Sequence, residues 1–223
     1  MPRPATTLMM RPASAGGVRR AANAWDRWYR TQQAPWRGET LVAELVPLLQ
    51  GPVLELGCGN GKTLLPLRRA GLDAVGLDIS WNVLRRVPGP RVLADARRLP
   101  FGSEAFGSVL DLHCTGHLLA EGRRLAAADI ARVLRPGGTL VTERLGIDDL
   151  RTGTGTWVEG EAWTRRLADG RTTHFSDEAD LVGDFVAAGL EVVEVGRIER
   201  GITHRGEPVL RSAVRAVLRK PAA

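Results

Sequence analysis

The sequence predicts an α/β fold with a parallel central sheet and helices on both of its faces. From residue 53 to residue 145, short apolar stretches of strand length alternate with segments of helical periodicity. Because such an alternation builds β-α-β crossovers, its strands run parallel. Two long strand-like segments then close the chain with no helix between them, and this arrangement favours an antiparallel hairpin.

Size and composition indicate a single cytoplasmic domain. The chain has 223 residues, of which 43% are hydrophobic and 25% are charged, as in ordinary globular proteins. A chain of this length buries a sizeable core without disulfide or metal support. It has no run of about 18 apolar residues, so we expect no membrane span. Two cysteines, Cys58 and Cys114, exclude a disulfide scaffold and fit a reducing compartment.

The net charge of +6 is unevenly distributed along the chain. Residues 1–37 contain seven arginines and one aspartate, and residues 196–223 contain six arginines and one lysine against two glutamates. The segment between them is therefore acidic. A basic protein suggests a nucleic-acid partner, but this distribution places any anionic macromolecule at the two ends rather than over the middle of the chain.

The amino-terminal segment predicts a basic tail followed by aromatic residues. Residues 1–21 hold no acid and several prolines and glycines, so we expect them to be disordered, although an arginine-rich start is also typical of a transit peptide. Residues 22–223 then form one domain. We expect a short helix at 22–30 and an amphipathic helix at 39–50.

The remaining elements follow from periodicity and from the residues that end helices. An irregular segment at 145–176, rich in Thr, Gly, Arg and Trp, predicts a lid over a substrate site, with one hairpin. The expected strands are 53–56, 74–77, 91–94, 108–112, 139–143, 192–200 and 209–219, and the expected helices are 62–70, 80–86, 120–134 and 176–188.

A glycine-rich turn, residues 57–61, follows the first strand of the sheet. Glycines at such a turn let the backbone approach a ligand closely, and the next helix begins there. Two phosphate-binding turns fit poorly. A P-loop needs four residues between its glycines, whereas Gly57 and Gly61 are separated by three. A dinucleotide-binding turn needs a third glycine where Lys62 stands.

Acidic residues end the first three strands: Glu55, Asp78 and Asp95. Because the carboxyl ends of parallel strands line the ligand crevice, we expect the three carboxylates to face one ligand. Asp78 is placed to accept both ribose hydroxyls of an adenosine, Asp95 to accept an adenine amino group, and Glu55 to order the turn around an ammonium or sulfonium. The alternative is that each acid caps the helix that follows it.

Four segments of the sequence resemble the class I S-adenosylmethionine-dependent methyltransferases. The resemblance spans about residues 22–219 and implies a Rossmann-like, doubly wound sheet of seven strands, in the order 3-2-1-4-5-7-6 with strand 7 antiparallel. It also implies S-adenosylmethionine as the cofactor and S-adenosylhomocysteine as the product. The four segments are Glu55-Leu-Gly-Cys-Gly-Asn-Gly61, Gly76-Leu-Asp78-Ile-Ser80, Ala94-Asp95-Ala96 with Leu99-Pro-Phe101, and Arg132-Val-Leu-Arg-Pro-Gly-Gly138.

The resemblance also implies cofactor contacts, position by position. It implies that the methionine moiety lies at the glycine-rich turn and the ribose at the acid that ends the second strand. Adenine is expected between an apolar residue and the end of the third strand. The residues are Gly57, Gly59 and Gly61 with Leu112 and His113 for methionine, Asp78 for ribose, and Ile79, Asp95 and Ala96 for adenine.

Three amino-terminal aromatic residues, Trp25, Tyr29 and Trp36, are spaced as in methyltransferases of the thiopurine and tellurite-resistance type. The resemblance implies that they close over the methionine end of the cofactor, where a ring face attracts a sulfonium cation. The alternative is ordinary packing of a helix on the sheet.

Histidines supply the candidates for proton transfer. His113 and His117 follow the fourth strand, and either is a candidate general base, although methyl transfer also proceeds by proximity alone. His113, Cys114 and His117 have the residue types of metal ligands, but no further ligand cluster accompanies them, so we predict no metal. In the lid segment, His174 and Trp157 are candidate substrate contacts.

Together these features predict a methyltransferase that moves a methyl group to N, O or S of a small-molecule acceptor. A small acceptor is favoured because the sequence shows no separate RNA-binding domain. Transfer to RNA, such as tRNA, is the alternative suggested by the basic charge, and a non-catalytic cofactor-binding protein is a second alternative. The acceptor, the methylated atom and the oligomeric state stay open.

Overall fold

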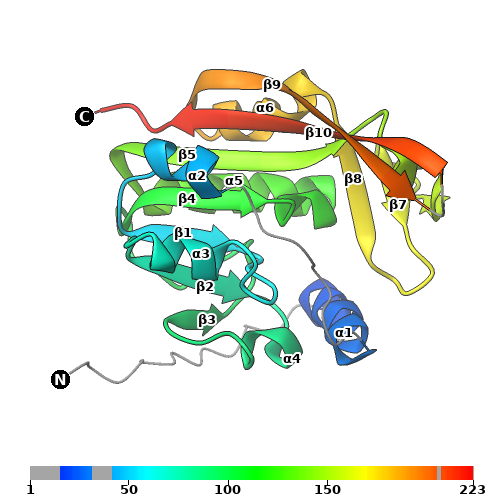
Figure 1. Cartoon of the computed structure of the whole chain (residues 1–223), viewed down its shortest axis with the longest axis horizontal. Helices are drawn as coiled ribbons and strands as arrows, with labels where there is room; N and C mark the ends of the chain where they lie inside the picture. The colour runs from blue at the N-terminus through cyan, green and yellow to red at the C-terminus, as the bar shows by residue number, and fades with distance from the viewer. Residues whose placement is uncertain (1–15, 32–41, 205–206, 223) are drawn as a thin grey trace.

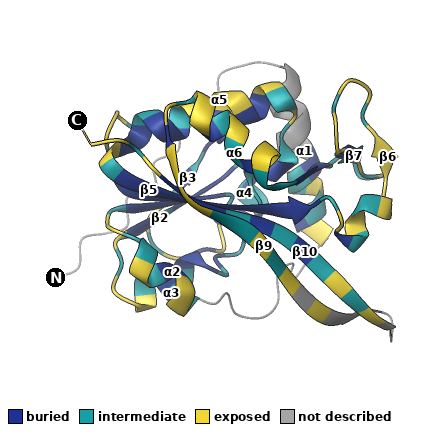
Figure 2. Ribbon diagram, turned by 90° about the horizontal axis from the view of Figure 1, so that it is seen from above, coloured by how far each residue is buried: buried dark blue, intermediate teal, exposed yellow. Residues whose placement is uncertain are grey.

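The computed structural model describes residues 16–31, 42–204 and 207–222 of the chain. These residues form a central twisted sheet between two layers of helices (Figure 1). Helices α5 (Ala120–Val133) and α6 (Glu178–Ala187) cover one face of the sheet, whereas α2 (Val42–Leu45) and α3 (Leu64–Arg69) cover the other (Figure 2). The architecture is therefore the doubly wound α/β fold that the strand–helix alternation predicts.

The sheet contains the predicted strand order. Strands β3, β2, β1, β4 and β5 run parallel in that spatial order, and β10 pairs antiparallel with both β5 and β9. If the strands of the lid are left out and β9 and β10 are counted as the sixth and seventh strands, the order is 3-2-1-4-5-7-6. Their bounds are β1 Val53–Leu56, β2 Ala74–Asp78, β3 Arg91–Leu93, β4 Phe106–Leu112, β5 Leu134–Gly146, β9 Glu191–His204 and β10 Glu207–Arg219.

The lid, residues 145–176, adds three further strands where we predicted one hairpin. It begins with a 3-10 turn, Leu150–Gly153, and continues as β6 (Thr156–Trp157), β7 (Thr164–Arg166) and β8 (Thr172–Ser176). The three strands form an antiparallel meander, and β8 joins the main sheet through a short parallel pairing with the end of β5. The lid is thus an extension of the sheet rather than an irregular loop.

Two predicted helices differ most in extent from those observed. Helix α1 spans Gly16–Thr31, so residues 16–21, which we assigned to a disordered tail, are helical. The predicted helix at 39–50 is reduced to the four residues of α2 and a 3-10 turn, Val46–Leu48. Pro47 explains the change, because proline has no N–H for the interior of an α-helix. Residues 39–41 lie outside the described residues.

Two apolar clusters hold the layers together, one on each face of the sheet. The first packs α5 and α6 on β1, β4, β5 and β10, with Ile130 and Phe185 fully buried. The second packs α2 and α3 on the opposite face, with Leu45 and Leu64 fully buried. In the described part of the chain, no helix is both long enough and apolar enough to cross a membrane.

One edge of the sheet gathers the segments that matter for ligand binding. The carboxyl ends of the parallel strands point toward α1, the short helix α4 (Trp81–Leu84) and the lid (Figure 1). A 3-10 turn, Thr115–His117, follows β4 at the same edge. Ligands of doubly wound sheets bind at this edge, outside the carboxyl ends of the strands.

Candidate active site

A cavity of about 560 Å³ lies at the carboxyl edge of the sheet. It is lined by the ends of β1, β2, β4 and β5 on one side, and by α1, the lid and β10 on the others. This volume falls in the usual range for small-molecule and cofactor sites. The predicted residues Ile79, Ala96 and Leu112 contribute apolar parts of its wall.

The three glycines of the turn have different positions. All three adopt positive φ, and only Gly57 lines the cavity. A Cβ on Gly57 would lie 2.9 Å from the Cys114 Sγ atom, so the turn tolerates no side chain there. Gly59 and Gly61 lie behind the wall, where Gly61 packs against Leu65 at the start of α3. The predicted direct contact therefore fits Gly57, whereas the other two glycines shape the turn.

Asp78 joins the glycine-rich turn to the segment after β2. Its Oδ2 accepts a hydrogen bond from the Gly59 backbone N–H at 2.9 Å, and its Oδ1 accepts one from the Ser80 N–H at 2.8 Å. Burial raises the pKa of Asp78 to about 6, against the effect of these two hydrogen bonds. The carboxylate thus organises both segments and also lines the cavity.

Glu55 is a buried carboxyl with an unused oxygen. Burial raises its pKa to about 8, and the negative charge of Asp78 adds to the shift. It accepts hydrogen bonds at the start of α3, from the Leu64 backbone and the Thr63 side chain, yet its Oε2 has no partner. A cationic or hydrogen-bond-donating ligand group in the cavity would satisfy that oxygen.

Asp95 is held by a residue that we did not predict. Its carboxylate accepts hydrogen bonds from the Arg97 backbone N–H at 2.9 Å and from the guanidinium Nε and Nη2 at 2.9 and 2.7 Å. Asp95 lines the cavity in a fixed orientation.

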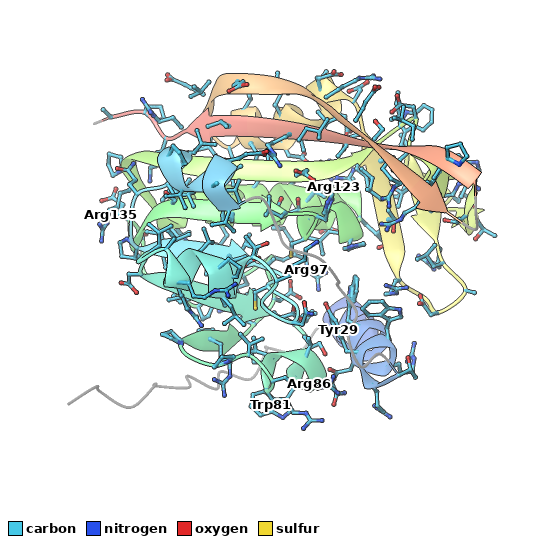
Figure 3. All side chains as sticks on the ribbon, viewed as in Figure 1. Tyr29, Trp81, Arg86, Arg97, Arg123 and Arg135 are labelled. Carbon is cyan, nitrogen blue, oxygen red and sulfur yellow. The ribbon has the colours of Figure 1, made fainter. Side chains whose placement is uncertain are left out.

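Helix α1 supplies aromatic side chains to the cavity wall. Trp25 and Tyr29 both line it, with ring centroids 5.7 Å apart, and Tyr29 projects from the helix toward the sheet (Figure 3). Trp28 also lines the cavity, although the sequence did not single it out. Asp26 fixes the helix to the β2 edge by accepting hydrogen bonds from the Ser80 hydroxyl and the Asn82 N–H. Trp36 lies outside the described residues.

The lid contacts α1 across the cavity. The guanidinium of Arg171 lies 4.9 Å from the centroid of the Trp25 ring and 4.4 Å from that of Trp28. Asp169 pairs with the same guanidinium at 2.8 Å, and the Asp169 carbonyl accepts a hydrogen bond from Arg27 at 3.3 Å. These contacts make α1 and the lid a joint cover over the cavity.

His113 is supported by a carboxylate from the neighbouring strand. It adopts a positive φ of 71°, and its Nε2 lies 3.2 Å from the Glu143 Oε1 atom. Arg215 donates two hydrogen bonds to the other oxygen of Glu143. Although burial opposes it, His113 and Arg215 together lower the pKa of Glu143 to about 2. The His113 Nδ1 is buried in the cavity wall without a hydrogen-bond partner.

His117 is a neutral imidazole of defined tautomer. Its Nδ1 lies 2.7 Å from the Thr172 carbonyl oxygen, which can only accept, so Nδ1 carries the proton and Nε2 keeps its lone pair. Burial lowers the pKa of His117 to about 4, and the charges of His113, Arg171 and Arg151 act in the same direction. The ring packs edge-on against Trp25, with centroids 4.8 Å apart.

The two predicted substrate contacts are placed differently. His174 lines the cavity but is only 1% exposed, and both ring nitrogens are engaged, by the Thr164 hydroxyl at 2.9 Å and the Asp180 carboxylate at 2.7 Å. Trp157 does not line the cavity, which corrects its prediction as a substrate contact. It lies on the outermost strand of the meander, 50% exposed, beneath the Arg165 guanidinium.

The segment that builds the cofactor side of the cavity matches a known family. Residues 54–142 match the family model described as a methyltransferase domain, and they contain the glycine-rich turn, Asp78 and Asp95. Over this segment the chain is similar to methyltransferases. The predicted strand order is confirmed.

The matches between this chain and two curated relatives cover only part of each protein. The O-methyltransferase cnsE of Penicillium expansum is 32% identical over 142 residues, which are 56% of this chain and 50% of the relative. A demethylmenaquinone methyltransferase of Renibacterium salmoninarum is 36% identical over 116 residues, which are 49% and 47% of the two chains. The chain thus spans about half the length of these relatives.

A solved structure has a similar fold over nearly the whole chain. It is the 1,6-didemethyltoxoflavin-N1-methyltransferase of Burkholderia thailandensis with bound 1,6-didemethyltoxoflavin and S-adenosylhomocysteine. The TM-score is 0.67 at 20% identity, and the match covers 95% of this chain and 93% of that one. At this identity the likeness concerns the fold.

The cavity residues are compatible with S-adenosylmethionine, the cofactor expected from the sequence. The unpartnered Glu55 Oε2 suits a cationic ligand group, the bare backbone at Gly57 permits close approach, and Asp78 lines the cavity. Lys62, which sequence reasoning noted only as a departure from a glycine pattern, lines the same side. In the described residues, no group of three or more His, Cys, Asp or Glu is arranged to hold a metal.

Proposed function

We propose that the protein transfers a methyl group from S-adenosylmethionine to a nitrogen, oxygen or sulfur atom of a small molecule. The observation that carries this proposal is the joint cover of α1 and the lid over a cavity of about 560 Å³. A covered cavity suits a compact acceptor better than a polymer. The solved 1,6-didemethyltoxoflavin-N1-methyltransferase, which holds 1,6-didemethyltoxoflavin, supports the same class of acceptor.

Each wall of the cavity has a part in the proposed reaction. When bound, the cofactor supplies a methyl group that its sulfonium already activates, so the protein contributes mainly position and exclusion of water. Glu55, Asp78 and Asp95 hold the cofactor at the ends of β1–β3. The rings of Trp25 and Tyr29 cover it, and the acceptor occupies the side formed by the lid, β5 and β10.

We expect His113 to act as the base that accepts the proton lost by the acceptor. Glu143 orients its Nε2, so the partner-free Nδ1 is the nitrogen that takes a proton. We expect His113→Asn to lower kcat by about 100-fold. His117→Asn is the matched comparison, with less than about a tenfold loss, because a pKa of about 4 makes His117 a weak base. Equal rates for both variants and the unaltered protein would show that the proton leaves to water.

The basic charge of the closing strands gives little support to an RNA acceptor. Arg211 pairs with Asp149 at 2.7 Å, Arg215 with Glu143 at 2.8 Å, and Arg197 with Asp148 at 2.9 Å. Guanidinium groups engaged in this way are not free to neutralise phosphates.

We place the reaction in the cytoplasm, which the two free cysteines support.

Transfer of a tritiated methyl group tests the proposed function. The protein is incubated with labelled S-adenosylmethionine and a cell extract separated into small-molecule, RNA and protein fractions. We expect label in the small-molecule fraction, and none with Asp78→Ala. Label in RNA would overturn the proposed acceptor class. Cofactor binding without any transfer would favour the non-catalytic alternative.

A further inference from the structure

We propose that the methyl acceptor carries an oxyanion, such as a carboxylate, which binds Arg151 at the lid side of the cavity. The inference rests on the proposed function and names the acceptor's chemical class. It follows from the charges that line the cavity, from the pairing of each charge, and from the position of Arg151, which has no ion pair among the described residues.

Charges of opposite sign line the two halves of the cavity. The half formed by β1–β3 carries the acids Glu55, Asp78 and Asp95, which suit a cationic cofactor. The half formed by β5, β10 and the lid carries four arginines and one glutamate. The arginines of this acceptor half are Arg144, Arg151, Arg171 and Arg215.

Two of these arginines are neutralised by carboxylates. Arg215 pairs with Glu143 at 2.8 Å and with Glu44 at 3.3 Å. Arg171 pairs with Asp169 at 2.8 Å while it lies over the aromatic rings of α1. Neither guanidinium therefore needs a ligand to balance its charge.

Arg151 has no acid within pairing distance among the described residues. The acid closest to it in sequence, Asp149, is fully buried, and its oxygens are occupied. Oδ1 accepts from the Arg151 backbone N–H at 3.0 Å, and Oδ2 accepts from the Arg211 Nε at 2.7 Å and the Ser212 N–H at 3.1 Å. Arg151 is thus an exposed residue that lines the cavity with a guanidinium in no ion pair with the described residues, although the negative charge of Asp149 acts on it.

A second arginine, Arg144, lines the same half of the cavity, and its charge is partly balanced by Asp111, Asp180 and Asp184. Arg144 is 1% exposed, and its Nη1 is buried with no hydrogen-bond partner, 3.9 Å from the Asp180 carboxylate. Partial burial and the charges of Arg211 and Arg171 lower the pKa of Arg151 from its ordinary value. An anion at the mouth would relieve this crowding of positive charge.

The chemistry of guanidinium selects the kind of anion. Its planar fork of N–H donors matches the two oxygens of a carboxylate or another oxyanion and binds them in a bidentate manner. The cofactor's own carboxylate has a different cation available, since Lys62 lines the cavity from the glycine-rich turn. We therefore assign Arg151 to the acceptor.

Benzoate and benzamide, which are similar in shape and differ in charge, test this assignment. Each is titrated by calorimetry into the protein saturated with S-adenosylhomocysteine. We expect benzoate to bind at least tenfold more tightly than benzamide. Arg151→Gln removes that preference, while the affinities for benzamide and for S-adenosylhomocysteine stay unchanged. Arg166→Gln is the matched control, because Arg166 is an exposed lid arginine that does not line the cavity, and it keeps the preference.

Several results would overturn the inference alone. These are no measurable benzoate binding, equal affinity for the two probes, an unchanged preference in Arg151→Gln, or the same loss in Arg166→Gln. Loss of S-adenosylhomocysteine affinity in Arg151→Gln would assign this residue to the cofactor instead. If the unaltered protein bound no S-adenosylhomocysteine, the proposed function would fail, and this inference with it.

Discussion

Asp78→Ala is expected to weaken the binding of S-adenosylhomocysteine by about 100-fold or more. The carboxylate lines the cavity at the position predicted for ribose, and it also holds the Gly59 and Ser80 N–H groups in place. Each hydrogen bond to a charged group contributes roughly 1.5–3 kcal/mol, so loss of two such bonds to ribose accounts for the effect. Isothermal calorimetry measures it directly.

Two comparisons separate a binding effect from a folding effect. Asp73→Ala removes an exposed aspartate just before β2, at the other end of the same strand, and leaves the affinity unchanged. Asp78→Asn keeps a carbonyl acceptor for the turn and serves if the alanine variant unfolds. An Asp78→Asn protein with the thermal midpoint and the affinity of the unaltered chain would contradict a role for this carboxylate in ribose binding.

Glu55→Gln is expected to stabilise the ligand-free protein at alkaline pH. The folded state holds the Glu55 proton to about pH 8, whereas the unfolded chain releases it near pH 4.5. Between these values the unfolded state binds fewer protons, so the free energy of unfolding falls as pH rises. The loss is complete above about pH 8 and is on the order of 4 kcal/mol. Glutamine does not ionise, and the variant avoids this loss.

Urea denaturation at pH 5 and pH 8.5 measures this difference. We expect Glu55→Gln to match the unaltered protein closely at pH 5 and to exceed it by a few kcal/mol at pH 8.5. Glu194→Gln, which removes an exposed glutamate on β9, changes stability little at either pH. A Glu55→Gln protein that is less stable than the unaltered one at pH 8.5 would contradict the buried, ligand-free carboxyl.

The same residue links cofactor binding to proton release. A cationic group beside Glu55 lowers the pKa of its carboxyl, so binding of S-adenosylhomocysteine at pH 7 expels a proton into the buffer. Calorimetry in two buffers of different ionisation enthalpy counts that proton. We expect the release to disappear in Glu55→Gln, together with part of the affinity.

The placement of three acids on one side of the cavity could be predicted from the sequence because each depends only on its own short segment of the chain. Each of its acids stands at the end of a strand whose apolar run marks it, and parallel strands bring those ends together. Glu55, Asp78 and Asp95 could therefore be placed without knowing how the rest of the chain folds. The turn glycines were harder to separate, because only the three-dimensional path shows that Gly57 faces the cavity and Gly61 faces α3.

The acceptor half depends on partners that are far apart in the chain. Glu143 meets His113 and Arg215 across three strands, and 72 positions separate the carboxylate from that arginine. The periodicity of the sequence does not predict contacts between residues on different strands. The role of Arg151 is equally hidden, because it depends on Asp149 being occupied by Arg211, 62 positions away. The direction of the Trp157 side chain could not be predicted for a related reason. An aromatic residue in this segment gives the same sequence pattern whether it faces the cavity or the solvent.

The contact between α1 and the lid has a consequence for the rate at which ligands are exchanged. Arg171 lies over Trp25 and Trp28, and Arg27 holds the Asp169 carbonyl, so the two covering segments separate only when these contacts break together. S-Adenosylhomocysteine formed beneath them has to wait for that separation. The lifetime of these contacts is therefore expected to limit how fast the product leaves the site.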